Sequence, residues 1–310
     1  MLDLICLGNL TIDDIVHPDG ATRMGCFGGD AIYAALGASY WTDAVQFVAP
    51  VGADFPPEHL SRLKQARWDV SGLPRRQVQS IRNWVVYEYD GRRTWILRSN
   101  PDDFLELSPT WEDIPPAFRD TKAAMILAMD LAAQEALATR LKATGALVAL
   151  DPQEDYIAGN QARILKMLSH VDIFLPSQEE VYRLLGHRDY PRAAREFAGY
   201  GCETVVVKMG GEGSLIFDQV TGRCIELPVY PATVTDTTGA GDAYCGGFLA
   251  MYVQSQDLVK AGLAGSVSAS FAIEDFGLAH MFQVDRSTAE QRLSELAALY
   301  SKMYRSAIDE

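Results

Sequence analysis

The sequence predicts an α/β fold in which helices flank a doubly wound, mostly parallel sheet. Short apolar runs rich in Val, Ile and Leu recur along the chain, segments of helical period separate most of them, and no linker or low-complexity tract interrupts the series. Alternating strands and helices of this kind build βαβ units, whose parallel strands are covered on both faces. We therefore expect one domain that spans residues 1–310.

The expected strands coincide with the apolar runs, and the expected helices lie between them. The strands are residues 4–7, 45–51, 124–129, 147–150, 171–175, 204–207 and 214–217. The helices are residues 30–41, 131–142, 161–168 and 191–200. The runs have the length of buried strands, and the segments between them have helical apolar spacing. After Gly239 a stretch rich in Ala, Gly and Ser favours closely packed helices, and residues 287–308 predict a terminal surface helix.

Residues 79–98, QSIRNWVVYEYDGRRTWILR, depart from this alternation. Two β-rich arms flank Asp90 and Gly91, a pair that favours a two-residue hairpin turn. We expect antiparallel sheet beside the parallel core, with residues 78–100 and about 10–25 forming a β-hairpin lid over a ligand cleft. The alternative is an edge hairpin that only closes the sheet.

Composition restricts the classes of partner. The chain has 41 acidic and 27 basic residues and a formal charge of −14, which disfavours a broad cationic face for nucleic acid. Its five cysteines are scattered without zinc-ligand spacing, as is usual for reduced, buried thiols of a cytoplasmic protein. No stretch reaches the ~20 apolar residues of a membrane span. We expect neither nucleic acid nor membrane as a partner.

Polar residues follow several of the predicted strands. They are Asp130, Asp151, Ser177, Glu179, Glu180 and Lys208. In a doubly wound sheet the carboxyl ends of the strands form the edge where ligands bind. Each residue alone is also a common loop residue or helix cap, but together they predict a polar site at one edge.

The stretch DTTGAGDAYCGGF, residues 236–248, carries the strongest functional signal. Residues 237–241 are small, so their amides can approach a ligand closely, and they precede a helix that begins near Asp242. A helix amino terminus attracts phosphate oxygens, whereas an ionised Asp242 repels them. That carboxylate is better suited to accept a proton from an attacking hydroxyl. The structural alternative is a glycine-rich turn with an aspartate that stabilises the first helical turn.

Other phosphate-binding motifs do not fit this chain. A dinucleotide fingerprint requires a glycine where Tyr244 stands, three residues after Gly241. A Walker loop requires a Gly-Lys-Ser or Gly-Lys-Thr triplet, which the sequence lacks. Nicotinamide and P-loop chemistry are therefore disfavoured.

The same stretch resembles the carboxy-terminal signature of the ribokinase-like (PfkB) carbohydrate kinase family. The double glycine before DAIYAALGA is similar to the family's amino-terminal element, and VVVKMGGEGSLIF is similar to its nucleotide-side strand, turn and strand. The opening ICLGNLTIDDIV is similar to the family's first strand. Together these regions cover nearly the whole chain, and the resemblance implies a ribokinase-like fold.

The resemblance also implies the parts of a phosphoryl-transfer site. Asp242 would be the catalytic base, and the amides of Gly239, Ala240 and Gly241 would form an anion hole. The sugar pocket beneath the lid would be lined by Asp13, Gly28, Gly29, Asp30 and Tyr33. The family usually has Asn at the position of Tyr33, so this residue implies either a differently shaped pocket or a side chain turned into the core.

The nucleotide side follows from the same resemblance. Lys208, Gly210, Gly213 and Ser177 would lie towards ATP, and Glu180 would act on Mg²⁺ through water. In some members the loop that corresponds to Asp236 also binds a monovalent cation. Ser177 replaces the usual Asn of an Asn-x-x-Glu element, and its hydroxyl has a shorter reach to a phosphate or a metal-bound water.

The expected function is ATP-dependent phosphorylation of a hydroxyl on a small sugar or sugar derivative. One alternative is a nucleoside kinase of the same fold, because aromatic residues of the hairpin could stack on a base: Trp84, Tyr87, Tyr89 and Trp95. The other alternative is a ligand-binding protein that has lost turnover. A homodimer formed through the lid is expected by analogy with some relatives.

Overall fold

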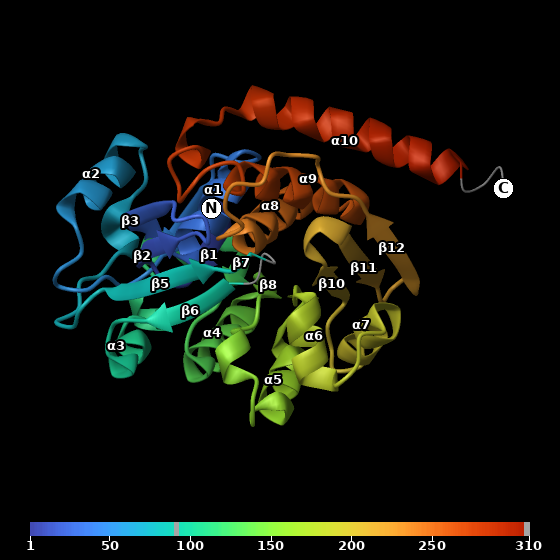
Figure 1. Ribbon diagram of the computed structural model, residues 1–310. Coiled ribbons are helices and arrows are strands. Elements are labelled where there is room, and N and C mark those ends of the chain that lie inside the picture. The colour runs from blue at the N-terminus through green and yellow to red at the C-terminus, as the bar shows by residue number, and fades with distance from the viewer. Residues whose placement is uncertain (90–92, 307–310) are drawn as a thin grey trace.

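The main sheet is mostly parallel, as predicted (Figure 1). The computed structural model describes residues 1–89 and 93–306. In these residues, eight strands form the sheet in the order β12-β11-β10-β9-β8-β7-β1-β4, and only β11 and β12 join it antiparallel. Their bounds are β1 Leu2–Leu7, β4 Val45–Val48, β7 Thr121–Ile126, β8 Leu147–Leu150, β9 Ile173–Phe174, β10 Thr204–Lys208, β11 Ser214–Asp218 and β12 Arg223–Leu227.

Helices cover both faces of this sheet (Figure 1). One apolar core contains side chains of α1, α8, α9 and α10, and a second core on the opposite face contains side chains of α4 to α7. The bounds are α1 Asp30–Ser39, α2 Pro57–Gln65, α3 Pro101–Glu106, α4 Leu131–Thr144, α5 Gln161–Met167, α6 Gln178–Leu185, α7 Tyr190–Ala198, α8 Ala240–Ser255, α9 Leu258–Ala272 and α10 Arg286–Ser306. The expected order of strands and helices is therefore present, with ends that differ by a few residues.

Residues near the two predicted lid segments form a second, four-stranded sheet beside the main one. Its order is β3-β2-β5-β6, with bounds β2 Thr11–Val16, β3 Thr22–Gly28, β5 Ile81–Tyr87 and β6 Arg93–Leu97. Strands β5 and β6 pair antiparallel, as the hairpin pattern predicts, while β2 pairs parallel with β5. The predicted turn residues Asp90 and Gly91 lie outside the described residues. Whether this sheet acts as a lid stays a prediction.

Two glycines allow α1 and α8 to pack with their backbones in contact. A Cβ atom on Gly246 would lie 1.9 Å from the Ala34 carbonyl oxygen, and one on Gly37 would lie 2.4 Å from the Ala243 carbonyl oxygen. This close approach explains why the stretch after Gly239 is rich in small residues. It also fixes α8, which carries Asp242, against α1, which begins with Asp30.

No helix in the described part of the chain combines the length and the apolar character needed to span a membrane.

Candidate active site

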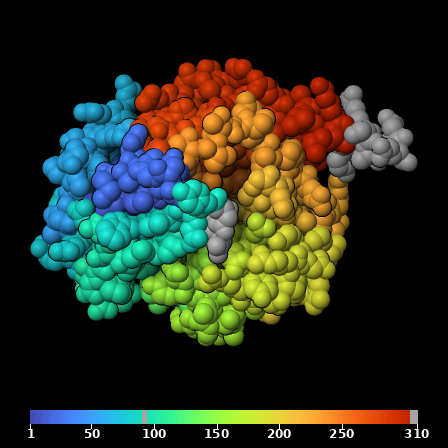
Figure 2. Space-filling view, in the orientation of Figure 1, coloured from blue at the N-terminus to red at the C-terminus, as the bar shows by residue number. Residues whose placement is uncertain are grey.

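A cleft of about 1240 Å³ lies where the main sheet faces the second sheet. Residues at the carboxyl ends of β1, β8, β9 and β10 line one side, including Asn9, Asp151, Ser177 and Lys208. Residues of β5 and β6 line the other side. Figure 2 shows the surface hollowed between the blue and teal strands of the second sheet and the orange part of the chain. Of the site residues that the resemblance implies, all line the cleft except Gly28 and Asp236. Asp130 and three of the four aromatic candidates for base stacking, Trp84, Tyr87 and Tyr89, also lie outside its lining.

The predicted anion hole is built on the amino terminus of α8. Gly239 caps the helix with φ +75°, a left-handed conformation that glycine adopts without strain. A Cβ atom there would also lie 2.2 Å from the Tyr33 ring, so the ring packs directly against the loop. The Ala240 amide donates to the Thr237 carbonyl at 3.3 Å, whereas the amide of Gly241 lies in the first turn, where an α-helix offers it no carbonyl partner.

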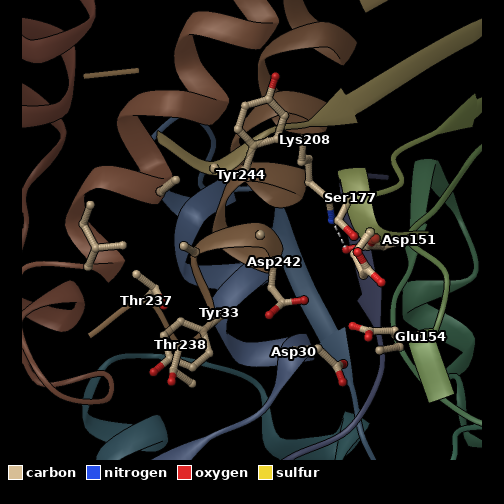
Figure 3. Close-up of a pocket in the computed structure, with 18 of the residues that line it drawn as sticks. Asp30, Tyr33, Asp151, Glu154, Ser177, Lys208, Thr237, Thr238, Asp242 and Tyr244 are labelled. Carbon is tan, nitrogen blue, oxygen red and sulfur yellow. Dashed lines mark hydrogen bonds and ion pairs between the residues drawn. The ribbon is translucent and has the colours of Figure 1, made fainter. Parts of the chain in front are cut away.

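Tyr33 therefore supports the anion-hole loop. Its side chain is buried at the wall of the cleft, and burial together with the negative charges of Asp236 and Asp13 raises the pKa of its phenol well above the usual value. Figure 3 shows it beside Thr237 and Thr238, the residues that lead into Gly239. The tyrosine at this position thus has a packing role that an asparagine of the usual family pattern could not fill.

Asp242 and Asp30 project into the same part of the cleft (Figure 3). Asp30 begins α1, and its Oδ1 accepts a hydrogen bond of 2.8 Å from the Asn9 amide. Burial and, next, the charge of Asp242 raise the pKa of Asp30 well above its ordinary range. Two carboxylates, one in the first turn of each helix, therefore face the region next to the anion hole.

Asp13 is held by two donors from the second sheet. Asn83 Nδ2 donates to its Oδ1 at 2.9 Å, and the Thr11 hydroxyl donates to its Oδ2 at 2.8 Å. Burial raises the pKa of Asp13 to about 6, although both hydrogen bonds oppose this shift. The aspartate, the asparagine and the threonine all line the cleft and form a polar set suited to hydroxyl groups.

The double glycine makes room for this polar set. A Cβ atom on Gly28 would lie 2.5 Å from Asp13 Oδ2, so any larger residue would displace the carboxylate. Gly29 has φ +115°, and a Cβ atom on it would lie 2.3 Å from the Asn9 carbonyl oxygen. The two glycines therefore matter because they leave space for the Asp13 carboxylate and the Asn9 carbonyl, and this role requires no contact with a substrate.

Lys208 provides a positive charge near the anion hole. Its ammonium group donates to Asp151 Oδ2 at 2.5 Å (Figure 3). A Cβ atom built on Gly241 would lie 3.5 Å from the same nitrogen, which places the charge beside the first turn of α8. Despite burial, the carboxylate of Asp151 raises the pKa of Lys208, so the ammonium stays protonated at neutral pH.

Ser177 and Glu180 form a capping box at the start of α6. The Ser177 amide donates to Glu180 Oε2 at 2.6 Å, and the Glu180 amide donates to the Ser177 hydroxyl at 3.2 Å. Burial, followed by the charge of Asp151, raises the pKa of Glu180 to about 8. The serine that replaces the family's asparagine thus has a structural partner, and the role of Glu180 towards Mg²⁺ stays a prediction.

The turn between β10 and β11 lies along the nucleotide side of the cleft, where the resemblance places it. Gly210 and Gly213 both have positive φ, at +57° and +94°, and both line the cleft. A Cβ atom on Gly213 would lie 2.0 Å from the Leu227 carbonyl oxygen. The turn therefore depends on glycine for its conformation.

Asp236 is buried behind the anion-hole loop. Its Oδ1 accepts hydrogen bonds from the Tyr87 hydroxyl and from the Thr238 amide, the latter at 2.8 Å. Its Oδ2 is buried without a hydrogen-bond partner among the described residues. Asp236 thus organises the loop, and its predicted contact with a monovalent cation stays a prediction.

The donor groups of the cleft suit a metal-bound nucleotide. Eight carboxylate side chains and one ammonium group line the described cleft: Asp13, Asp30, Asp151, Glu154, Asp155, Glu179, Glu180, Asp242 and Lys208. Asp151 Oδ1 is buried there without a hydrogen-bond partner. Within residues 1–89 and 93–306, no three His, Cys, Asp or Glu side chains are assembled closely enough to hold an ion by themselves. Mg²⁺ commonly takes one or two carboxylates and completes its shell with water and substrate phosphates.

Several residues that shape the site had no clear sequence signal. Asn9 follows the first strand directly, so the rule that places ligands at strand ends could have identified it. Asn83 and Tyr87 lie on the inward face of β5, where the alternation of the strand marks a face but does not show what that face meets. Thr11 opens β2, and only the tertiary structure shows that its hydroxyl contacts Asp13.

Comparison with known proteins defines the class of this protein as a small-molecule kinase of α/β fold. The model described as "pfkB family carbohydrate kinase" matches residues 3–284. The chain therefore belongs to this family, as the motifs predicted, and it is a phosphotransferase that acts on a hydroxyl group.

Individual relatives include nucleoside and sugar kinases. The cytidine kinase of Thermococcus kodakarensis is 30% identical over 279 residues, which cover 89% of this chain and 98% of that protein. The nucleoside kinase of Burkholderia thailandensis, solved with inosine, has a TM-score of 0.79 at 18% identity and covers 94% of this chain and 97% of its own. An Escherichia coli protein assigned as ribokinase II, solved with ATP and Mg²⁺, has a TM-score of 0.77 at 18% identity, with coverage of 95% and 100%.

Proposed function

We propose that this protein is an ATP-dependent nucleoside kinase. The observation that carries the proposal is an apolar and aromatic wall next to the polar set around Asp13. Leu97 lies directly opposite Asn83 in the β5–β6 register, and Trp95 lies two residues away on the same strand. Trp95, Leu97, Phe104 and Tyr156 all line the cleft, and the rings of Phe104 and Tyr156 lie 6.2 Å apart.

A nucleoside presents two chemically different parts, and the cleft offers a surface for each. The hydroxyls of a ribose would meet Asp13, Asn83 and Asn9, and a base would meet the aromatic wall, where stacking adds to its burial. A free sugar is polar on all sides and would leave that wall without a complementary partner. The cytidine kinase among the relatives supports the same choice of substrate class.

In the proposed reaction Asp242 takes the proton of the attacking hydroxyl. The amides of Gly239 and Gly241 donate to the oxygens of the transferring phosphoryl group, where negative charge has to be stabilised. Lys208 supplies positive charge beside the same turn. Asp13 and Asn83 orient the acceptor so that its hydroxyl reaches Asp242.

ATP, when bound with Mg²⁺, supplies the phosphoryl group and neutralises part of the charge on its oxygens. The residues that would hold the nucleotide are Lys208, Gly210, Gly213 and Ser177, with Asp151 and Glu180 towards the metal. Asp151 is the stronger candidate of these two, because one of its oxygens is buried without a hydrogen-bond partner, whereas Glu180 is engaged in the helix cap.

The decisive experiment is a substrate panel. ADP release would be measured with Mg-ATP and cytidine, uridine, adenosine, inosine, ribose, deoxyribose and fructose, with Asp242→Asn as a parallel control. Turnover confined to nucleosides and lost in Asp242→Asn is the expected result. Turnover with free sugars at equal or higher kcat/KM would overturn the nucleoside proposal in favour of a sugar kinase.

Trp95 provides a sharper version of this test. We expect Trp95→Ala to raise KM for a nucleoside about tenfold, because stacking on a base is worth ~1–3 kcal/mol, while kcat/KM for free ribose changes little. Trp84→Ala is the matched control, since Trp84 lies on the same hairpin but packs against the Arg98 guanidinium on the outer side. Equal losses in both variants would show that the hairpin is destabilised or its expected dimer contact is lost, and would contradict base stacking on Trp95.

The second sheet is also proposed to act as a lid. It contributes Asp13, Asn83 and Trp95 to the cleft, so an acceptor would bind both sheets at once. Binding of this kind favours a closed position in which water is excluded from the reacting atoms. Small-angle scattering with and without the acceptor found in the panel is the measurement, and an unchanged radius of gyration would argue against closure.

A monovalent cation at Asp236 stays a prediction. Activity measured with K⁺ and with Na⁺ over a range of concentrations tests it.

A further inference from the structure

One side chain of the second sheet is bonded to the loop that leads into the anion hole. The Tyr87 hydroxyl, on the last residue of β5, donates to Asp236 Oδ1. The Thr237 amide donates to the same hydroxyl at 3.2 Å, and the Thr238 hydroxyl lies 3.2 Å away. Asp236 in turn accepts from the Thr238 amide. A single phenol oxygen thus contacts three consecutive residues just before Gly239.

The ring of Tyr87 is fixed, so its hydroxyl has a defined position. It is buried with Ile15 and Val85 in the small apolar cluster of the second sheet. The imidazole of His17 packs on the ring at 4.6 Å between centroids, and the ring of Phe276 packs on His17 at 5.0 Å. A rigid ring that carries one hydroxyl can hold a loop in place more precisely than a flexible side chain can.

The same strand also holds the proposed acceptor site. Asn83 and Tyr87 are four residues apart on β5, so both project from one face of the sheet. Asn83 donates to Asp13, which we place against the acceptor, and Tyr87 contacts the loop of the anion hole. Strand β5 is therefore a direct physical connection between the acceptor and the phosphoryl-binding amides.

We propose that Tyr87 is a positioning residue that makes the geometry of the anion hole depend on the acceptor-bound position of the second sheet. The inference rests on the proposed kinase function. When the acceptor fixes β5, the Tyr87 hydroxyl holds residues 236–238 so that the amides of Gly239 and Gly241 point at the transferring group. Without that hydroxyl, acceptor binding and nucleotide binding are no longer coupled.

The test compares Tyr87→Phe with Tyr89→Phe. Tyr87→Phe removes the hydroxyl and keeps the ring that packs on His17. Tyr89 lies on the same hairpin just beyond β5, is 88% exposed and donates to the Pro18 carbonyl, so its variant controls for the loss of a hydroxyl from this hairpin. With Mg-ATP and the acceptor identified by the panel, we expect kcat to fall about 10- to 100-fold in Tyr87→Phe only, because small misplacement of catalytic groups is costly, while the acceptor KM changes less than about threefold.

A binding measurement separates positioning from simple destabilisation. The affinity of the non-hydrolysable analogue β,γ-imido-ATP with Mg²⁺ would be measured by calorimetry with and without the acceptor. The wild-type protein is expected to bind the analogue more tightly when the acceptor is present, and Tyr87→Phe is expected to lose this enhancement. An unchanged enhancement together with an unchanged kcat would overturn the proposal.

Hydrogen exchange tests the contact independently of activity. The amides of residues 237–241 should exchange faster in Tyr87→Phe than in the wild type, and they should not in Tyr89→Phe. If no acceptor on the panel is phosphorylated, the proposed function fails, while faster exchange would still establish the loop contact. Unchanged exchange would overturn the Tyr87 proposal even in an active kinase. Asp236→Asn is the second variant should Tyr87→Phe fail to fold, and combining both changes should cost no more than the worse single change.

Discussion

Asp242 differs in one respect from the other acidic residues that surround it: it lies in the first turn of α8, beside the amides of the proposed anion hole. Replacing it with Asn keeps the shape and removes the base. We expect Asp242→Asn to lower kcat by about 10² to 10⁴, the usual contribution of a positioned base, with little change in nucleotide affinity.

Asp30→Asn serves as the comparison for this prediction. Asp30 faces the same part of the cleft, but one of its oxygens is engaged by the Asn9 amide. We expect a smaller loss of kcat in that variant, measured in single-turnover reactions that separate chemistry from product release. If Asp30→Asn cost more than Asp242→Asn, the base would have to be reassigned.

Asp13 predicts a pH dependence of acceptor binding. Both of its oxygens accept hydrogen bonds from hydroxyls only when the group is ionised, and burial raises its pKa from 3.8 to about 6. The acceptor KM should therefore fall as pH rises through about 6 and should be constant above about 7. Thr11→Val should move this inflection to higher pH, because the Thr11 hydrogen bond lowers the pKa. A KM that is independent of pH between 5 and 8 would contradict the assignment.

The same group has the opposite effect on stability. The folded-state pKa of Asp13 lies above its unfolded value, so the folded protein binds this proton more tightly. Its contribution to the free energy of unfolding is present below about pH 4 and is lost as pH rises from about 4 to about 6. Denaturant melts of the wild type and Asp13→Asn across this interval should therefore differ in their pH dependence, with the wild type losing relative stability as pH rises.

At the scale of elements, the contact between α1 and α8 leaves no room for a side chain larger than that of glycine. A Cβ atom on Gly246 would lie 1.9 Å from a backbone oxygen of α1, and neither backbone can move without displacing other core residues. We expect Gly246→Ala to lower the free energy of unfolding by at least ~1–3 kcal/mol, the usual cost of overpacking, and to lower activity with it.

Gly211→Ala is the matched control for the helix contact. A Cβ atom on Gly211 meets nothing within 4 Å, and the residue lies in a turn at the edge of the main sheet. Urea unfolding of both variants is the measurement. If Gly246→Ala were as stable as Gly211→Ala, the close packing of α1 and α8 described above could not be correct.

The elements also show which features the sequence could predict. The Gly239 turn and the start of α8 are local, and the alternation of strands and helices is set by periodicity, so both were accessible. The contact of Asn83 with Asp13 joins residues 70 positions apart, and that of Tyr87 with Asp236 joins residues 149 positions apart. The first pair depends on the pairing of β2 with β5 and the second on how the second sheet is placed against the loop before α8, and a single sequence encodes neither as a local pattern.

Ser177 and Tyr33 show the same difference between local features, which the sequence reveals, and contacts between distant residues, which it does not. The spacing of Ser177 and Glu180 matches a capping box and could have been read as one from sequence. The packing of the Tyr33 ring on Gly239 could not, because it joins α1 to α8 through the folded core. The local helix cap was therefore predictable from the sequence, whereas the contact of a side chain in one helix with the start of another was not.

At the scale of the whole molecule, the exposed outer face of the second sheet leads us to expect a dimer. Its strands β3 and β6 have no further neighbour among the described strands, and Trp84 and Ile96, opposite each other in the β5–β6 register, are 42% and 43% exposed. We propose that a second copy of this chain covers this outer face. Sedimentation equilibrium should report a dimer, and Trp84→Glu should shift it to monomer, whereas Val220→Glu at a distant exposed turn should not. A monomeric wild type at micromolar concentration would contradict the dimer.

The eight carboxylates of the cleft have a consequence for the end of the reaction cycle. The acceptor enters with no charge on its hydroxyl and leaves as a phosphate monoester that carries roughly two negative charges at neutral pH. Among the described lining residues, Lys208 alone is positively charged, and it is paired with Asp151. After ADP has left, the new phosphate would lie beside the carboxyl groups of Asp30 and Asp242, with only the α8 amides and the paired Lys208 to offset its charge. Repulsion then favours dissociation of the product, so the cleft that accepts a neutral substrate expels its charged product, and inhibition by that product should be weak at low ionic strength and strengthen as salt screens the repulsion.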